Sequence, residues 1–191
     1  MNWANFVTCS RIAMIPVVML LYTLEFPWHH LYATAVFGIA SFTDWLDGYL
    51  ARRLNQTSDF GAFLDPVADK LLVVMVLVLL VDNYNSIWFV VPVSLIIGRE
   101  ILISALREWM ASRQQRDVVA VAFAGKVKTT VQMIAIIILL ASDPNGYALF
   151  WQTGYVFIYV AAGLSLYSMI QYFAAAWAHL QPGTGKENQG L

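Results

Sequence analysis

Four aspartates stand close together in the first half of the chain, at spacings that a helix converts into shared faces. Asp44 and Asp47 are three residues apart, and Asp65 and Asp69 are four residues apart. Because residues at i, i+3 and i+4 share one face of a helix, each pair forms a stripe. Gathered carboxylates repel one another unless cations neutralise them, and hard oxygen ligands suit Mg²⁺ or Mn²⁺. The spacing therefore predicts a divalent-metal site shared by two helices.

Small residues and one arginine accompany these acids. Gly48, Ala51 and Gly61 remove side-chain bulk where a flat nucleotide or a phosphate approaches the backbone. Arg52 lies one turn beyond Gly48, and its guanidinium group can hold phosphate oxygens in bidentate fashion. One pair of acidic residues at a helix end is common and needs no functional explanation. Four aspartates, three small residues and one arginine in a fixed register at a membrane edge indicate function. The segment 44–69 is therefore the candidate catalytic site.

The elements that must position this segment are long and apolar. Hydrophobic residues make up 60% of the 191 residues and charged residues only 12%, and the mean hydropathy is +0.64. This composition excludes a disordered chain, and an ordinary water-soluble globule needs more surface charge. The net charge of -1 excludes nucleic-acid binding through bulk charge, and the single cysteine excludes a disulfide framework or a multi-cysteine metal site. We predict an all-α integral membrane protein.

Six stretches have the length that a membrane-spanning helix needs, roughly 17–25 residues. Lys and Arg are absent from the connections near 25–29, 82–86 and 142–147, and they gather on the other side. Because positive residues stay in the cytosol, both termini and the aspartates are predicted to face it. We expect one membrane catalytic domain over residues 1–180 and a polar tail over 181–191. The predicted spans are residues 6–25, 29–50, 63–82, 86–109, 124–142 and 147–176.

The pattern of these acids resembles the signature of the CDP-alcohol phosphotransferase family, Asp-x2-Asp-Gly-x2-Ala-Arg-x8-Gly-x3-Asp-x3-Asp, without a departure. The resemblance implies an enzyme with that family's fold, which joins an alcohol to a CDP-activated group and releases CMP. It also implies that the four aspartates hold two divalent metal ions and that Asp69 is the general base. The residues that it assigns to the CDP site are Gly48, Ala51, Arg52 and Gly61.

A second group of charged residues, on the later helices, indicates an acceptor that carries its own phosphate. Arg99 lies inside a predicted span, a depth that is unusual for an arginine without a partner or a wet cavity. Arg107 lies about two turns beyond Glu100, which we expect to orient it. Lys126 and Lys128 point in nearly opposite directions, so only one should face the site, and Lys126 is favoured. The candidate ligands of the acceptor phosphate are Arg107, Lys126, Arg99 and Lys128.

Further stretches are similar to the bacterial members of this family that make phosphatidylglycerol phosphate. They are residues 104–110, residues 125–130, and Asn5 and Thr8 with the arginine and proline that follow them. The resemblance implies CDP-diacylglycerol as donor, sn-glycerol 3-phosphate as acceptor, and Asn5 and Thr8 in the donor site. It also implies a homodimer in the bacterial cytoplasmic (inner) membrane.

Two alternatives stay open from the residues alone. The same chemistry could use another acceptor, such as inositol phosphate or serine. A divalent-cation transporter would place its charges near the bilayer midplane, often with broken helices or repeats. Here the acids cluster at one edge and the sequence contains no visible repeat, which disfavours a transporter.

Overall fold

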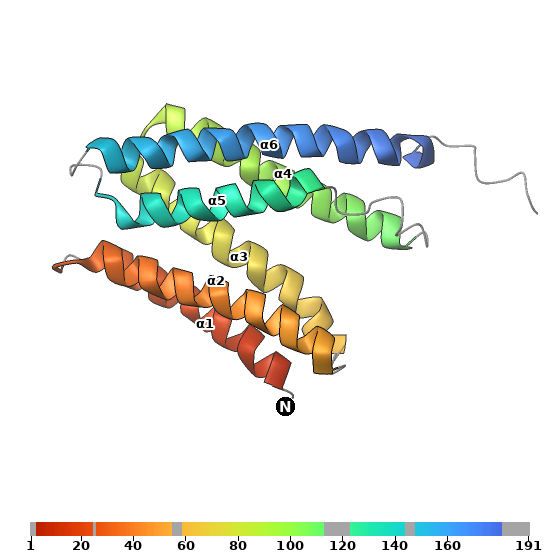
Figure 1. The fold of residues 1–191 in the computed structure, drawn as a ribbon, viewed down its shortest axis with the longest axis horizontal. Coiled ribbons are helices and arrows are strands. Elements are labelled where there is room, and N and C mark those ends of the chain that lie inside the picture. Colours follow the sequence, from red (N-terminus) through yellow and green to blue (C-terminus); the bar gives the residue numbers. More distant parts are fainter. Residues whose placement is uncertain (1–2, 25, 55–58, 113–122, 144–147, 181–191) are drawn as a thin grey trace, which may run out of the picture.

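In the computed structural model, the described part of the chain is a bundle of six α-helices and contains no strand (Figure 1). Each helix overlaps one of the apolar stretches, which confirms the all-α class. The helices are α1 (Trp3–Thr23), α2 (His29–Leu54), α3 (Asp59–Tyr84), α4 (Ile87–Ser112), α5 (Phe123–Ala141) and α6 (Ala148–Leu180). The structure describes the backbone of residues 3–24, 26–54, 59–112, 123–143 and 148–180, and the side chains of residues 10–24, 26–43, 67–68, 70–110, 127–143, 148–175 and 177.

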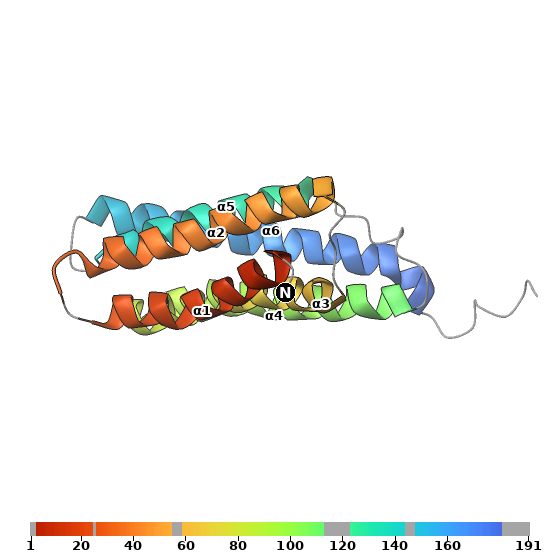
Figure 2. The ribbon, with the colours of Figure 1, turned by 90° about the horizontal axis from the view of Figure 1, so that it is seen from below.

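The helices are arranged so that chemically important segments share one end of the bundle. Figure 2 shows α2 and α5 on one side, with α1, α3 and α4 on the other. α5 packs along α6, which also packs on α4, and α1 packs on both α2 and α3. The last residues of α1, α3 and α5 and the first residues of α2, α4 and α6 lie at one end (Figure 1). The ends of α2 and α4 and the starts of α3 and α5 therefore lie toward the opposite end.

Apolar side chains cover the outside of this bundle as well as its core. Phe37 and Leu77 are fully buried, whereas Trp88, Leu149 and Ile170 are more than half exposed on outward faces. Charged and polar side chains, by contrast, occur in the interior. Soluble proteins rarely expose apolar surface on this scale. An apolar exterior around a partly polar interior is typical of helices surrounded by lipid.

Two described helical segments are long and apolar enough to cross a membrane, Ile87–Met110 and Ala148–Ala175. Ser10–Thr23 and Val127–Ala141 are apolar but shorter. In the described residues, helix length and hydropathy thus support two membrane spans, and the six-span topology stays a prediction from the sequence.

α5 and α6 approach each other closely at Gly154. A Cβ atom at this position would lie 2.6 Å from Cγ and Cδ2 of Leu139, which is fully buried on α5. A Cβ atom at Gly163 would meet nothing within 4 Å. The missing side chain at Gly154 thus allows α6 to lie against α5.

We expect Gly154→Ala to destabilise the bundle by about 1–3 kcal/mol, because the added methyl group overpacks a filled core. At roughly 2–4 °C per kcal/mol for a chain of this size, thermal unfolding in detergent should detect the loss. Gly163→Ala is the matched control on the same helix, and it should leave the Tm unchanged or slightly raise it. Equal Tm values for the two variants would contradict the close approach at Gly154.

Candidate active site

The structure places the eight residues of the 44–69 segment on two consecutive helices, and the end of the first and the start of the second lie toward the same end of the bundle. Asp44, Asp47, Gly48, Ala51 and Arg52 lie in α2, and Gly61, Asp65 and Asp69 lie in α3. Only residues 55–58 separate the two helices, so the end of α2 stays within reach of the start of α3. The side chains of these eight residues, and of Asn5, Thr8 and Lys126, lie outside the described residues. Their metal and substrate contacts therefore stay predictions.

A cavity of about 650 Å³ lies next to this segment, with walls from α1 to α5. Most of its lining is apolar, including Phe42 and Leu77. Lys70, which directly follows Asp69 in the chain, lines it, so one wall adjoins the aspartate segment. Cavities of this size and character are typical of ligand sites. The charged or amide side chains that line it are Arg11, Lys70, Glu100, Lys128 and Gln132.

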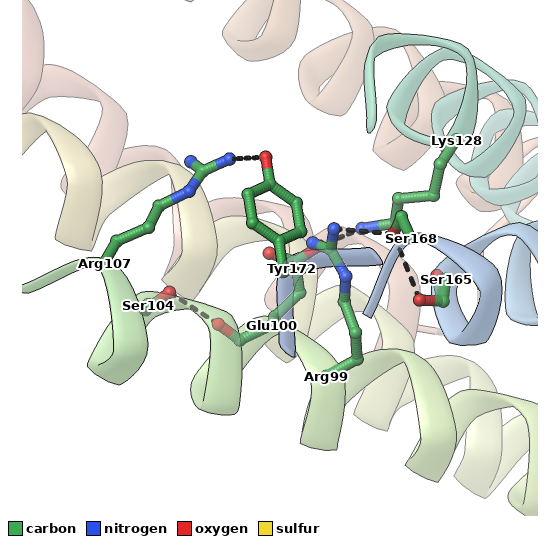
Figure 3. A network of polar contacts seen from close by, with 8 residues as sticks. All are labelled: Arg99, Glu100, Ser104, Arg107, Lys128, Ser165, Ser168 and Tyr172. Carbon is green, nitrogen blue, oxygen red and sulfur yellow. Dashed lines mark hydrogen bonds and ion pairs between the residues drawn. The ribbon is translucent and has the colours of Figure 1, made fainter. Parts of the chain in front are cut away.

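Three of the predicted phosphate ligands gather in one cluster beside this cavity. Figure 3 shows Arg99 and Arg107 of α4 and Lys128 of α5 around Glu100 and Tyr172. Lys128 is only 1% exposed, and its Nζ forms an ion pair with Oε1 of Glu100. Nη1 of Arg99, itself 7% exposed, lies 3.5 Å from the same oxygen. One carboxylate thus holds two cations that come from different helices.

Helix α6 supplies the remaining partners of this cluster. Nη2 of Arg99 donates a hydrogen bond to Oγ of Ser168 at 2.8 Å, and Ser168 donates to the backbone oxygen of Ser165 at 3.1 Å. Nη2 of Arg107 donates to the hydroxyl of Tyr172. The Tyr172 ring centroid lies 5.7 Å from Cζ of Arg99 and 5.0 Å from Cζ of Arg107.

Sequence reasoning missed these α6 residues, although a signal for them was present. Ser165, Ser168 and Tyr172 follow one another at spacings of three and four on an otherwise apolar helix. That spacing places them on one face, and a polar face on an apolar helix points toward a polar interior.

The structure differs from the sequence-based prediction in the partner of Glu100 and in the lysine that it shows buried. The prediction that Glu100 orients Arg107 is wrong, because Glu100 meets Lys128 and Arg99 while Arg107 bonds to Tyr172. Arg107 lies seven residues beyond Glu100 in the sequence, about 10.5 Å along the helix, whereas Lys128 reaches the carboxylate directly from α5. The structure also turns Lys128 inward, whereas the sequence favoured Lys126, whose side chain lies outside the described residues.

The cluster carries an excess of positive charge. Among its described residues, the cations Arg99, Arg107 and Lys128 face the single carboxylate of Glu100. Glu100 and Lys128 line the cavity as an ion pair, and Arg11 and Lys70 add two positive side chains to its lining. A pocket of this kind attracts anions, and guanidinium groups match the oxygens of a phosphate. The cluster is therefore suited to a phosphate monoester, which carries close to two negative charges at neutral pH.

Comparison with known proteins agrees with this geometry. The profile of the CDP-alcohol phosphatidyltransferase family matches residues 1–177. The chain belongs to this family, and the resemblance seen in the aspartate pattern is thereby confirmed.

Three similar bacterial proteins share the name CDP-diacylglycerol–glycerol-3-phosphate 3-phosphatidyltransferase. A protein of that name from Pseudomonas fluorescens is 50% identical over 190 residues, which cover 98% of this chain and 96% of the relative. One from Escherichia coli (strain K12) is 48% identical over 179 residues, covering 94% and 97% of the two chains. One from Salmonella typhimurium is 47% identical over 175 residues, covering 92% and 94%.

We expect Glu100→Ala to destabilise the protein by about 3 kcal/mol or more, because it leaves the buried Lys128 without a counter-charge. Thermal or denaturant unfolding in detergent measures this loss, and Lys128→Met in the same chain should recover most of it. Glu108→Ala, at an exposed position on the same helix, is the matched control. A loss of stability no larger than that of Glu108→Ala would show that the Glu100–Lys128 ion pair does not stabilise the protein.

Proposed function

We propose that this chain transfers the phosphatidyl group of CDP-diacylglycerol to sn-glycerol 3-phosphate, giving phosphatidylglycerol phosphate and CMP. Relatives that are 47–50% identical over 92–98% of the chain bear the name of that activity. The single structural observation that carries the choice of acceptor is the cluster of Arg99, Arg107 and Lys128 around one carboxylate. An acceptor with its own phosphate balances this excess charge, whereas serine would leave it uncompensated.

The proposed setting is the bacterial cytoplasmic (inner) membrane, crossed six times by residues 1–180, with the catalytic end in the cytosol. The apolar exterior of the bundle supports insertion into lipid. The gathering of Lys and Arg at the end that carries the aspartates supports the orientation. In this arrangement a lipid-linked diphosphate keeps its acyl chains in the bilayer and presents its nucleotide to the cytosol.

The metal site of the proposal is made of Asp44, Asp47, Asp65 and Asp69. Members of this family generally depend on divalent metal ions. An all-carboxylate donor set fits hard cations such as Mg²⁺ or Mn²⁺, and α2 and α3 carry both pairs toward one end of the bundle. Two ions bound there would neutralise charge on the pyrophosphate and on the leaving CMP.

The chain's own residues have distinct tasks in the transfer. Asp69 accepts the proton of the acceptor hydroxyl, whose oxygen forms a bond to the lipid-linked phosphorus. The bond from that phosphorus to the bridging oxygen of CMP breaks, and CMP leaves with that oxygen. Binding the reactants in place supplies much of the remaining rate acceleration. The donor is held by Asn5, Thr8, Gly48, Ala51, Arg52 and Gly61, and the acceptor phosphate by Arg99, Arg107, Lys126 and Lys128.

The proposal is tested by incubating the purified protein with CDP-diacylglycerol, Mg²⁺ and one acceptor at a time. We expect CMP release and phosphatidylglycerol phosphate with sn-glycerol 3-phosphate, measured by nucleotide chromatography and lipid mass spectrometry. Turnover with inositol phosphate or serine but not with glycerol 3-phosphate would overturn the acceptor. Metal flux into proteoliposomes without any CMP release would favour a transporter.

Asp69→Asn should reduce turnover by roughly 10²-fold or more, since the acceptor hydroxyl loses its base. Binding of a CDP nucleotide, measured by calorimetry or fluorescence, should stay largely intact. Asp82→Asn, at an exposed position near the other end of the same helix, is the matched control and should keep full activity. Nucleotide binding lost as completely as turnover would assign Asp69 a metal-holding role alone.

A further inference from the structure

We propose that Tyr172 of α6 is a positioning residue that holds the guanidinium groups of Arg99 and Arg107 together as a clamp for the acceptor phosphate. This inference rests on the proposed function. The side chain combines two interactions, since its hydroxyl accepts a hydrogen bond from Arg107 and its ring lies within 6 Å of both arginines. Figure 3 shows the ring between the two guanidinium groups.

Helix α4 by itself does not bring these two arginines together. Arg99 and Arg107 are eight residues apart, which corresponds to about 12 Å along the helix axis. Their like charges also repel each other. A group outside α4 is therefore needed to hold both cations in one cluster. The negative face of an aromatic ring attracts guanidinium groups, and Tyr172 offers such a ring to both.

The two arginines differ in how firmly their surroundings fix them. Arg99 is 7% exposed and also bonds to Ser168 and Glu100. Arg107 is exposed, and the partner that the structure gives its guanidinium group is the phenol of Tyr172. Because a long exposed side chain samples many rotamers, this single bond decides whether Arg107 is in place when a substrate arrives.

Tyr172 is itself held in place by packing, so it can fix the position of the arginine side chains. It is 4% exposed and packs in a small apolar cluster with Ile103, Leu106 and Met110 of α4. The packing orients the ring, and the hydroxyl then extends toward Arg107. A preorganised cation pair loses less conformational freedom on binding an anion than a mobile one does. Tyr172 should therefore act on acceptor affinity and leave the donor site alone.

The test compares Tyr172→Phe, which keeps the ring and its packing but removes the hydroxyl, with Tyr172→Leu, which removes both. For each variant kcat and the KM of both substrates are measured with the full-length protein in detergent or vesicles. Loss of a hydrogen bond with a net contribution of ordinary size predicts about a threefold to tenfold rise in the glycerol 3-phosphate KM for Tyr172→Phe. Loss of the ring as well predicts about tenfold or more for Tyr172→Leu. The CDP-diacylglycerol KM and kcat should stay within about twofold of wild type, as for an interaction made equally in ground and transition states.

Two further measurements separate positioning from packing. Tyr167→Phe changes an exposed tyrosine of the same helix, one that bonds to Gln171, and should leave every constant unchanged. Arg107→Ala should raise the acceptor KM, and adding Tyr172→Phe to it should cause little further change, because both act through one contact. Inorganic phosphate should inhibit Tyr172→Phe more weakly than wild type.

Equal changes in both KM values, or a loss of stability with an unchanged acceptor KM, would overturn the inference and leave Tyr172 a packing residue. If Tyr172→Leu does not fold, Tyr172→Phe decides, since it preserves the ring. A glycerol 3-phosphate KM for Tyr172→Phe equal to that of the wild-type protein also overturns the positioning role of Tyr172. Failure of the wild-type protein to use glycerol 3-phosphate would instead overturn the proposed function.

Discussion

The structure depends on the compensation of charges that are buried within an apolar bundle. Lys128 is 1% exposed and Arg99 is 7% exposed, and both stand on helices whose outer faces are apolar. An isolated charge in such surroundings is costly, whether the surroundings are protein interior or lipid. Glu100 reduces this cost for both cations at once. α4 and α5 must therefore be placed so that this carboxylate lies between the two cationic groups.

Glu100 compensates only part of the positive charge of the cluster, and the positive charge that remains can bind an anion. A fully neutral cluster would attract no anion, whereas three unpaired cations would destabilise the bundle. One carboxylate with hydroxyl groups from α6 stabilises the cluster and leaves positive charge available. Glu100 and Lys128 line the large cavity together with Arg11 and Lys70, so positive charge lies where an anionic substrate can use it.

Helix α6 has a larger part in the site than its apolar composition suggests. Its outward face is exposed and apolar, as at Ile170, while its inward face presents Ser168 and Tyr172 to the arginines of α4. Gly154 allows the same helix to lie directly on α5. The last helix thus links the two helices that carry the cations, and it contributes to both the packing and the chemistry of the cluster.

The sequence by itself determined the features that depend on neighbouring positions in the chain. The spacing of Asp44, Asp47, Asp65 and Asp69 defines two helical stripes, and apolar runs define the six helices. Only the tertiary structure decided which charged groups pair. Glu100 meets Lys128 across 28 positions and Arg107 meets Tyr172 across 65, whereas the spacing along α4 predicts that Glu100 pairs with Arg107. The physical reason is that periodicity tells which residues share a face of a helix, whereas the choice of facing partner depends on how the helices pack.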